Sequence, residues 1–215
     1  MASVTVEWTV ADLYEQFGAI PVSRLRLQPA PGTATEQDVV DIEARENRLY
    51  ELIDGVLVEK VMGFYKSYLA GLLIQYLGTF VRERDLGVVA GADGTLKLVP
   101  DQVRIPDVSF VAWERLPDRR LPAEPIPQLA PDLAVEIISK GNTREEMARK
   151  LCEYFDAGVR LVWYIFPETR SVRVYTDPQS ETDLTDDAIL DGGEVLPGFR
   201  LPLRQLFSQP RQSAH

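Results

Sequence analysis

Histidine and cysteine are nearly absent from this chain of 215 residues, which has one copy of each. The histidine is the terminal His215, so we expect neither a histidine general base nor a His-rich metal site. The lone Cys152 excludes an internal disulfide and fits a reducing compartment, which favours a cytoplasmic location. Any acid–base or metal chemistry is therefore expected to use carboxylates and lysines.

Long apolar runs and an excess of positive charge are also missing. The most apolar helical segment, residues 68–81, is too short to cross a membrane, and residues 1–7 lack the pattern of a signal peptide, so we expect no membrane partner. A formal net charge of −10 and a pI near 4.7 count against a broad non-specific nucleic-acid surface. A local basic groove, or a carboxylate cluster that binds divalent cations, stays open.

At 215 residues the chain is long enough for one core with an appendage, and 45 % hydrophobic and 26 % charged residues are ordinary for a soluble globular protein. At its centre is the short apolar run at residues 133–138, which predicts a buried strand that contains one carboxylate, Glu136. Strand alternation places Glu136 on the same face of the strand as Ala134, and Val135 on the other face. A carboxylate is costly to bury unless a metal, a cation or several donors bind it. Glu136 is therefore the first candidate site residue.

Residues 48–61 predict a β-hairpin, because two alternating apolar strands flank the turn dipeptide Asp54-Gly55. Glu51 shares a strand face with the apolar Ile53, so it is a second candidate for a carboxylate directed inward. The alternative, equally weighted, is an edge-strand glutamate whose carboxylate reaches water.

Residues 104–113 predict one further apolar strand, with Pro106 near its start, where no ladder donor is required. Asp107 lies at the beginning of that strand. If this strand neighbours the strand of Glu136, the two carboxylates converge and can hold a hard divalent cation such as Mg²⁺ or Mn²⁺. Two carboxylates are a weak signal in isolation.

A helix is expected after Asn142, where Thr143 and Glu146 fit a capping box. On a helical wheel Lys150 lies at the edge of the apolar stripe and tilts toward the sheet, whereas Glu153 falls on the face expected to be wet. The alternative for Lys150 is a boundary lysine that extends to solvent. A lysine near the two carboxylates could orient an attacking water or stabilise phosphate charge.

Four motifs in this order resemble those of the Uma2 family, bacterial proteins of the PD-(D/E)XK nuclease superfamily regarded as restriction endonucleases. They are YELIDG at 50–55, RIPDV at 104–108, DLAVEIIS at 132–139 and KLCEYFDAGV at 150–159.

The resemblance implies an α/β fold with a restriction-endonuclease-like core, in which a mixed central sheet is flanked by helices. It divides the chain into an N-terminal helical extension packed on the core (1–47), the Uma2 domain (48–207) and a loose tail (208–215). It implies that Asp107, Glu136 and the Ile137 carbonyl bind the metal. Lys150 would replace the superfamily lysine, whose usual slot two residues after the glutamate holds Ile138, with Lys140 as a second possibility.

The leading interpretation is a Mg²⁺- or Mn²⁺-dependent DNA endonuclease with Asp107, Glu136 and Lys150 as catalytic residues and Glu51 contributing indirectly. Many nucleases of this fold cut two strands as dimers, so a homodimer is expected. The alternative is a nuclease fold that has become a binding or assembly module, which the acidic balance and Ile138 favour. On a third interpretation Glu136 is only an ion-pair partner of Lys150, so that a Lys150→Met variant folds normally and is harmless.

Overall fold

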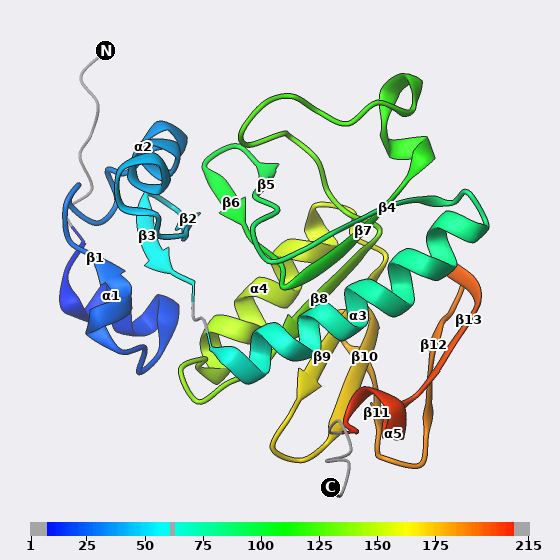
Figure 1. The fold of residues 1–215 in the computed structure, drawn as a ribbon. Coiled ribbons are helices and arrows are strands. Elements are labelled where there is room, and N and C mark those ends of the chain that lie inside the picture. The colour runs from blue at the N-terminus through cyan, green and yellow to red at the C-terminus, as the bar shows by residue number, and fades with distance from the viewer. Residues whose placement is uncertain (1–7, 61–62, 209–215) are drawn as a thin grey trace, which may run out of the picture.

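The computed structural model describes residues 8–60 and 63–208, and its centre is a six-stranded mixed sheet (Figure 1). The strand order is β11-β10-β9-β8-β7-β4. These strands are β4 (Gly87–Ala90), β7 (Val108–Ala112), β8 (Leu133–Ile137), β9 (Leu161–Phe166), β10 (Ser171–Asp177) and β11 (Ser180–Leu184). β8 and β9 run parallel on either side of a helical crossover, whereas the other neighbouring pairs are antiparallel. The predicted mixed α/β core is confirmed.

A second, five-stranded sheet lies beside the first, in the order β1-β3-β2-β6-β5. Its strands are β1 (Leu25–Arg26), β2 (Tyr50–Ile53), β3 (Val56–Glu59), β5 (Leu96–Val99) and β6 (Gln102–Arg104). β2 and β3 form the predicted hairpin, with Ile53 opposite Val56. Its turn residues Asp54 and Gly55 have φ of 48° and 73°, a left-handed conformation that aspartate tolerates and glycine favours.

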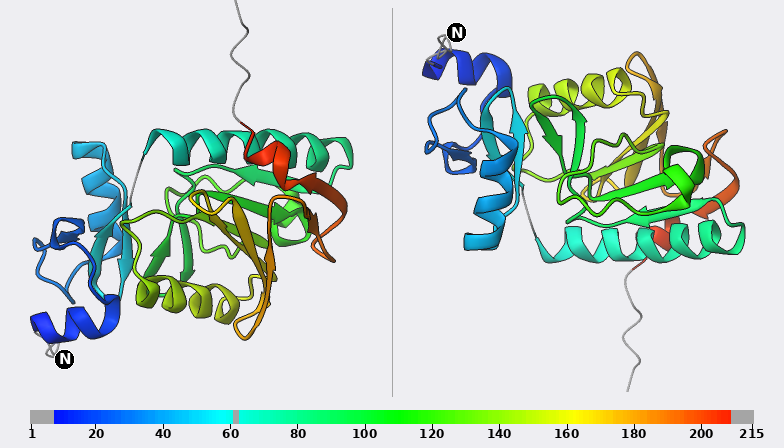
Figure 2. Two further views of the ribbon diagram at one scale, coloured as in Figure 1. Left: turned by 90° about the horizontal axis from the view of Figure 1, so that it is seen from below. Right: turned by 90° about the horizontal axis from the view of Figure 1, so that it is seen from above.

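Two helices cover opposite faces of the central sheet (Figure 2). On one face α3 (Phe64–Glu83) packs with the ribbon of β12 (Ile189–Gly192) and β13 (Leu196–Pro202) and with α5 (Leu203–Leu206). On the other face lies α4 (Arg144–Asp156). The predicted alternation in β8 is confirmed, because Val135 belongs to the α3 core and Ala134 to the α4 core.

The N-terminal helices are α1 (Val10–Phe17) and α2 (Glu36–Glu46), and three short 3₁₀ turns complete the fold at Val22–Arg24, Trp113–Arg115 and Pro117–Arg119. A threonine begins each of α1, α2 and α4 with a capping box, formed by Thr9, Thr35 and Thr143. The N-terminal segment docks on α4, where the Thr143 hydroxyl donates to the Phe17 carbonyl at 2.6 Å.

The strand expected at 104–113 is wrong in one respect, because it is two strands in different sheets. β6 ends at Arg104 in the five-stranded sheet, and β7 begins at Val108 in the central sheet. Between them stands Pro106, which has no N–H to donate to a ladder. The chain therefore changes sheets at the residues that lead into Asp107.

Parts of three predictions lie outside the described residues: the N-terminal extension at residues 1–7, the end of the hairpin at 61 and the tail at 209–215. In the part of the chain that the structure describes, no helix combines the length and the hydropathy of a membrane span.

Candidate active site

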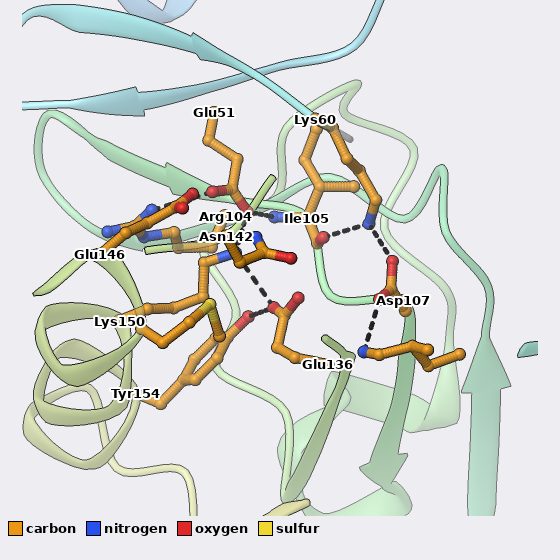
Figure 3. Close-up of polar contacts among 12 residues, drawn as sticks. Glu51, Lys60, Arg104, Ile105, Asp107, Glu136, Asn142, Glu146, Lys150 and Tyr154 are labelled. Carbon is orange, nitrogen blue, oxygen red and sulfur yellow. Dashed lines mark hydrogen bonds and ion pairs between the residues drawn. The ribbon is translucent and has the colours of Figure 1, made fainter. Parts of the chain in front are cut away.

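Asp107 and Glu136 lie side by side at the junction of the two sheets. The β7–β8 register pairs Val108 with Val135, and one further step brings Asp107 opposite Glu136. The Asp107 N–H continues the ladder by donating to the Val135 carbonyl at 2.9 Å. Residues opposite each other in an antiparallel pair project to the same face, so the two carboxylates approach one another, as Figure 3 shows.

The Asp107 carboxylate is only 1 % exposed and is held by three donors. The ammonium of Lys60 lies 3.1 Å from Oδ1, that of Lys66 lies 3.0 Å from Oδ2, and the Ile137 N–H donates to Oδ2 at 2.7 Å. Burial would raise the pKa of Asp107, but the two ammoniums and the N–H together hold that pKa below its ordinary value. Asp107 is therefore a carboxylate held in its charged form.

Glu136 is 4 % exposed, and both of its hydrogen bonds end on Oε1. The Tyr154 hydroxyl donates at 2.6 Å and the Lys150 ammonium at 3.2 Å, whereas no described residue donates to Oε2. Burial raises the pKa of Glu136; Lys150 opposes the rise, and the negative charges of Asp107 and Glu51 add to it. Glu136 thus keeps one oxygen available and lacks full compensation of its charge.

Lys150 joins Glu136 to Glu51, with its ammonium 2.9 Å from Glu51 Oε1. Of the alternatives left open for Glu51, the structure shows the inward one, because this side chain accepts from Arg104 and from the Ile105 N–H at 2.9 and 3.0 Å. Although burial disfavours both charges, the ion pairs raise the pKa of Lys150 and lower that of Glu51. The ammonium is therefore charged at neutral pH.

Lys140, Lys150 and Ile138 are the residues that bear on where the catalytic lysine lies. Lys140 is exposed and pairs with Glu168 at 3.5 Å, away from the two carboxylates. The ammonium of Lys150, reaching in from α4, lies against Glu136 while the slot itself holds Ile138. The roles assigned to these residues stay predictions.

The wheel-based placement of Glu153 on a wet face is wrong. Glu153 is buried and accepts from Arg104 Nε at 2.7 Å. The helical wheel accounts only for the face of α4 that packs on the central sheet. Arg104, at the end of β6 in the second sheet, contacts a different side of the helix and buries Glu153 there.

Four functional candidates escaped sequence reasoning: Lys60, Lys66, Arg104 and Tyr154. Lys60 directly follows the strand Val56–Glu59 and Arg104 ends the strand Gln102–Arg104, so neither lies inside an apolar run as Glu136 does. The ring of Tyr154 fits the apolar stripe of α4, so the sequence offered no reason to expect that its hydroxyl would bind Glu136. No local signal distinguishes Lys66 from other lysines in the first turn of a helix.

The donor set suits a hard divalent cation. No three Asp, Glu, His or Cys side chains gather as metal ligands in residues 8–60 and 63–208. Mg²⁺, however, is commonly held by one or two carboxylates together with waters and substrate phosphates. Asp107 with the free Oε2 of Glu136 meets that requirement, and the raised pKa of Glu136 marks a place where added positive charge would be favourable. The Ile137 carbonyl as a third ligand stays a prediction.

Comparisons with known proteins identify the family and a shared fold. The family model of Uma2, described as "Putative restriction endonuclease", matches residues 37–204. A similar solved structure is a crystal structure titled as a putative nuclease belonging to DUF820 from Anabaena variabilis ATCC 29413. It has a TM-score of 0.66 and 21 % identity, and the match covers 74 % of this chain and 89 % of that one, which shows a shared fold. A comparison with curated proteins finds no match. Since the family model spans most of the chain and includes Glu51, Asp107, Glu136 and Lys150, this protein is a member of the Uma2 family.

Proposed function

We propose that this protein is a divalent-metal-dependent nuclease that hydrolyses phosphodiester bonds in DNA. The observation that carries the proposal is the meeting of Asp107, Glu136 and Lys150 at one end of the central sheet, where two buried carboxylates and a buried ammonium converge. The family description and the fold of the DUF820 protein support the same reaction class.

Asp107 and Glu136 are the residues that would hold the metal. A bound Mg²⁺ or Mn²⁺ would supply positive charge to the phosphate and acidity to a coordinated water. The protein's contribution is to fix the two carboxylates, Asp107 through the Ile137 N–H and Glu136 through the Tyr154 hydroxyl.

Lys150 acts in this proposal as a fixed cation. Its raised pKa keeps the ammonium protonated at neutral pH, so it orients a water or stabilises the negative charge that develops on the phosphate. Oε2 of Glu136, which accepts from no described residue, is the oxygen left to hold the metal. Glu51 contributes indirectly, because it fixes the position of the Lys150 ammonium.

The test is cleavage of supercoiled and single-stranded DNA by purified protein in Mg²⁺ or Mn²⁺. We expect Glu136→Gln and Lys150→Ala to lower the cleavage rate by at least about 100-fold, the order of effect seen when a positioned charge is removed from an active site. Lys140→Met is the matched control, because it removes an exposed ammonium that pairs only with Glu168 among the described residues. Cleavage that survives both site variants would place the activity elsewhere.

The second candidate is a nuclease fold that serves as a binding or assembly module. The observation in its favour is that Asp107 is already neutralised by Lys60 and Lys66. It predicts no cleavage by folded wild type and partner binding that Glu136→Ala leaves unchanged. The homodimer and the cytoplasmic location stay predictions, and light scattering on the purified chain tests the first.

A further inference from the structure

A buried lysine and a half-buried lysine contact one carboxylate at the end of the site that faces α3. Lys60 and Lys66 lie 3.1 and 3.0 Å from the two oxygens of Asp107, and their side chains are 4 % and 13 % exposed. Lys60 also donates to the Ile105 carbonyl, and it is visible with that bond in Figure 3. A single ammonium would suffice to pair with Asp107, so the second requires an explanation.

The wider cluster carries no excess of negative charge among the residues that the structure describes. Its carboxylates are Glu51, Asp107, Glu136 and Glu153, and the cations that pair with them include Lys60, Lys66, Arg104, Arg149 and Lys150. A divalent cation on Asp107 would therefore add two positive charges next to two ammoniums in a poorly solvated place. Such a site binds the cation well only when an anion enters with it.

The surroundings of Lys66 favour an anion. Lys66 borders a small pocket of about 20 Å³ beside Gly63, Ser67 and Asp107, which has room for about one water, so a phosphate would reach the ammonium from the more exposed side of Lys66. The first turn of α3 contains no acidic residue, and Gly63 at its N-cap offers no side-chain acceptor to the helix N–H groups. Lysine's flexible four-carbon stem allows the ammonium to leave one oxygen partner for another within a few ångströms.

We propose that Lys60 and Lys66 form a phosphate subsite, and that their ammoniums pair with Asp107 as long as no ligand is bound. Without ligands the two ammoniums neutralise Asp107. When Asp107 ligates a divalent cation, they turn to the non-bridging oxygens of a phosphodiester, so cation and phosphodiester bind cooperatively. This inference rests on the proposed function, since it assigns the substrate-binding lysines of the same site.

The experiment measures Mn²⁺ binding to the purified full chain by electron paramagnetic resonance, with dimethyl phosphate or with sodium chloride at equal ionic strength. For the wild type we expect dimethyl phosphate to lower the Kd for Mn²⁺ by about tenfold, within the usual range of coupling between two ligands. Lys66→Met should bind Mn²⁺ about tenfold more tightly than the wild type in sodium chloride, because one competing ammonium is gone. The same variant should lose most of the effect of dimethyl phosphate.

Lys66→Met is the variant of choice because Lys66 is the more exposed of the pair, whereas Lys60 makes a second buried bond to the Ile105 carbonyl. Lys140→Met, which removes the same charge from the surface, should behave as the wild type. Circular dichroism verifies that each variant is folded.

Two different failures are distinguishable. If the wild type binds Mn²⁺ and Glu136→Gln abolishes that binding, but Lys66→Met behaves as the wild type, the phosphate subsite is wrong and the metal site stands. If no protein binds Mn²⁺ with or without dimethyl phosphate, the metal dependence proposed above fails and the subsite fails with it.

Discussion

Asp107 and Glu136 are neighbouring carboxylates that are similarly buried but whose pKa values shift in opposite directions. Each is almost fully buried on adjacent strands, yet the pKa of Asp107 lies below its ordinary value and the pKa of Glu136 above it. The difference lies in the number of cations. Two ammoniums serve Asp107, whereas the single ammonium of Lys150 is shared between Glu136 and Glu51.

Desolvation alone does not decide the direction in which the pKa of a buried carboxylate shifts. Burial raises the pKa of both groups, and the number of ammoniums nearby decides whether the pKa ends above or below its ordinary value. Asp107 has two ammoniums to itself, whereas Glu136 shares the ammonium of Lys150 with Glu51.

The largest effect is expected from Lys150→Met, which removes the cation shared by Glu51 and Glu136. Breaking a buried pair leaves uncompensated charge, so we expect a loss of about 3–5 kcal/mol in the free energy of unfolding. Chemical denaturation at neutral pH measures it. Lys66→Met should cost much less, below about 1 kcal/mol, because Lys60 still pairs with Asp107.

Lys150→Arg provides the control for charge, since it keeps a cation between the two glutamates and should recover most of the stability. Equal losses in Lys150→Met and Lys66→Met would contradict the idea that the two carboxylates differ in their supply of cations. A fully stable Lys150→Met would return Lys150 to the harmless ion-pair partner considered from the sequence.

An intermediate effect is expected from Tyr154→Phe, which removes the 2.6 Å hydrogen bond to Glu136 without changing any charge. A hydrogen bond to a charged group is worth about 1.5–3 kcal/mol, so thermal denaturation should show a loss of that order. Tyr164→Phe is the matched control, because the Tyr164 hydroxyl donates to the Met147 carbonyl on the same helix rather than to the site. A larger loss in the control would show that Glu136 gains little from Tyr154.

The smallest effect is a pH dependence of opposite sign for the two carboxylates, measured without divalent cations. The pKa of Glu136 is raised above 4.5, so the folded state holds this proton more tightly, and its contribution is lost as pH rises above 4.5 through the folded-state pKa. The pKa of Asp107 is lowered from 3.8, so its contribution is present above 3.8 and lost as pH falls through the folded-state pKa.

Denaturation across pH should therefore show Glu136→Gln gaining stability relative to the wild type as pH rises above 4.5. The slope is at most about 1.4 kcal/mol per pH unit for one proton. The advantage of the wild type over Asp107→Asn should instead shrink as pH falls below 3.8. Parallel profiles for the two variants would remove the distinction between the two carboxylates.

Local chemistry allowed much of this structure to be predicted from the sequence. The Asp54-Gly55 hairpin, the capping box at Thr143 and the alternation around Glu136 all depend on neighbours within a few residues. A charged residue inside an apolar strand was also enough to single out Glu136, because its burial demands a partner wherever the strand lies.

The rest depends on which elements meet in three dimensions. The apolar positions change from odd (Val103, Ile105) to even (Val108, Phe110) across Pro106, which marks an interruption of the strand but does not show that the chain enters another sheet there. The prediction for Glu153 was wrong because a helical wheel divides a helix into one buried and one exposed face, whereas α4 also contacts Arg104 on a second side. Lys60 and Lys66 resemble ordinary boundary lysines until the fold brings Asp107 within 3.1 Å of both.

The buried network of Glu51, Arg104, Lys150 and Glu153 also constrains how sequences of this kind can diverge. Its members come from β2, β6 and α4, so distant parts of the chain share one balance of charge. An isolated exchange at any of the four would strand a charge in the interior, whereas paired exchanges preserve the balance. Among relatives these positions should be inherited as a set or change together, and an alignment would then record the contact between the five-stranded sheet and α4 as covariation.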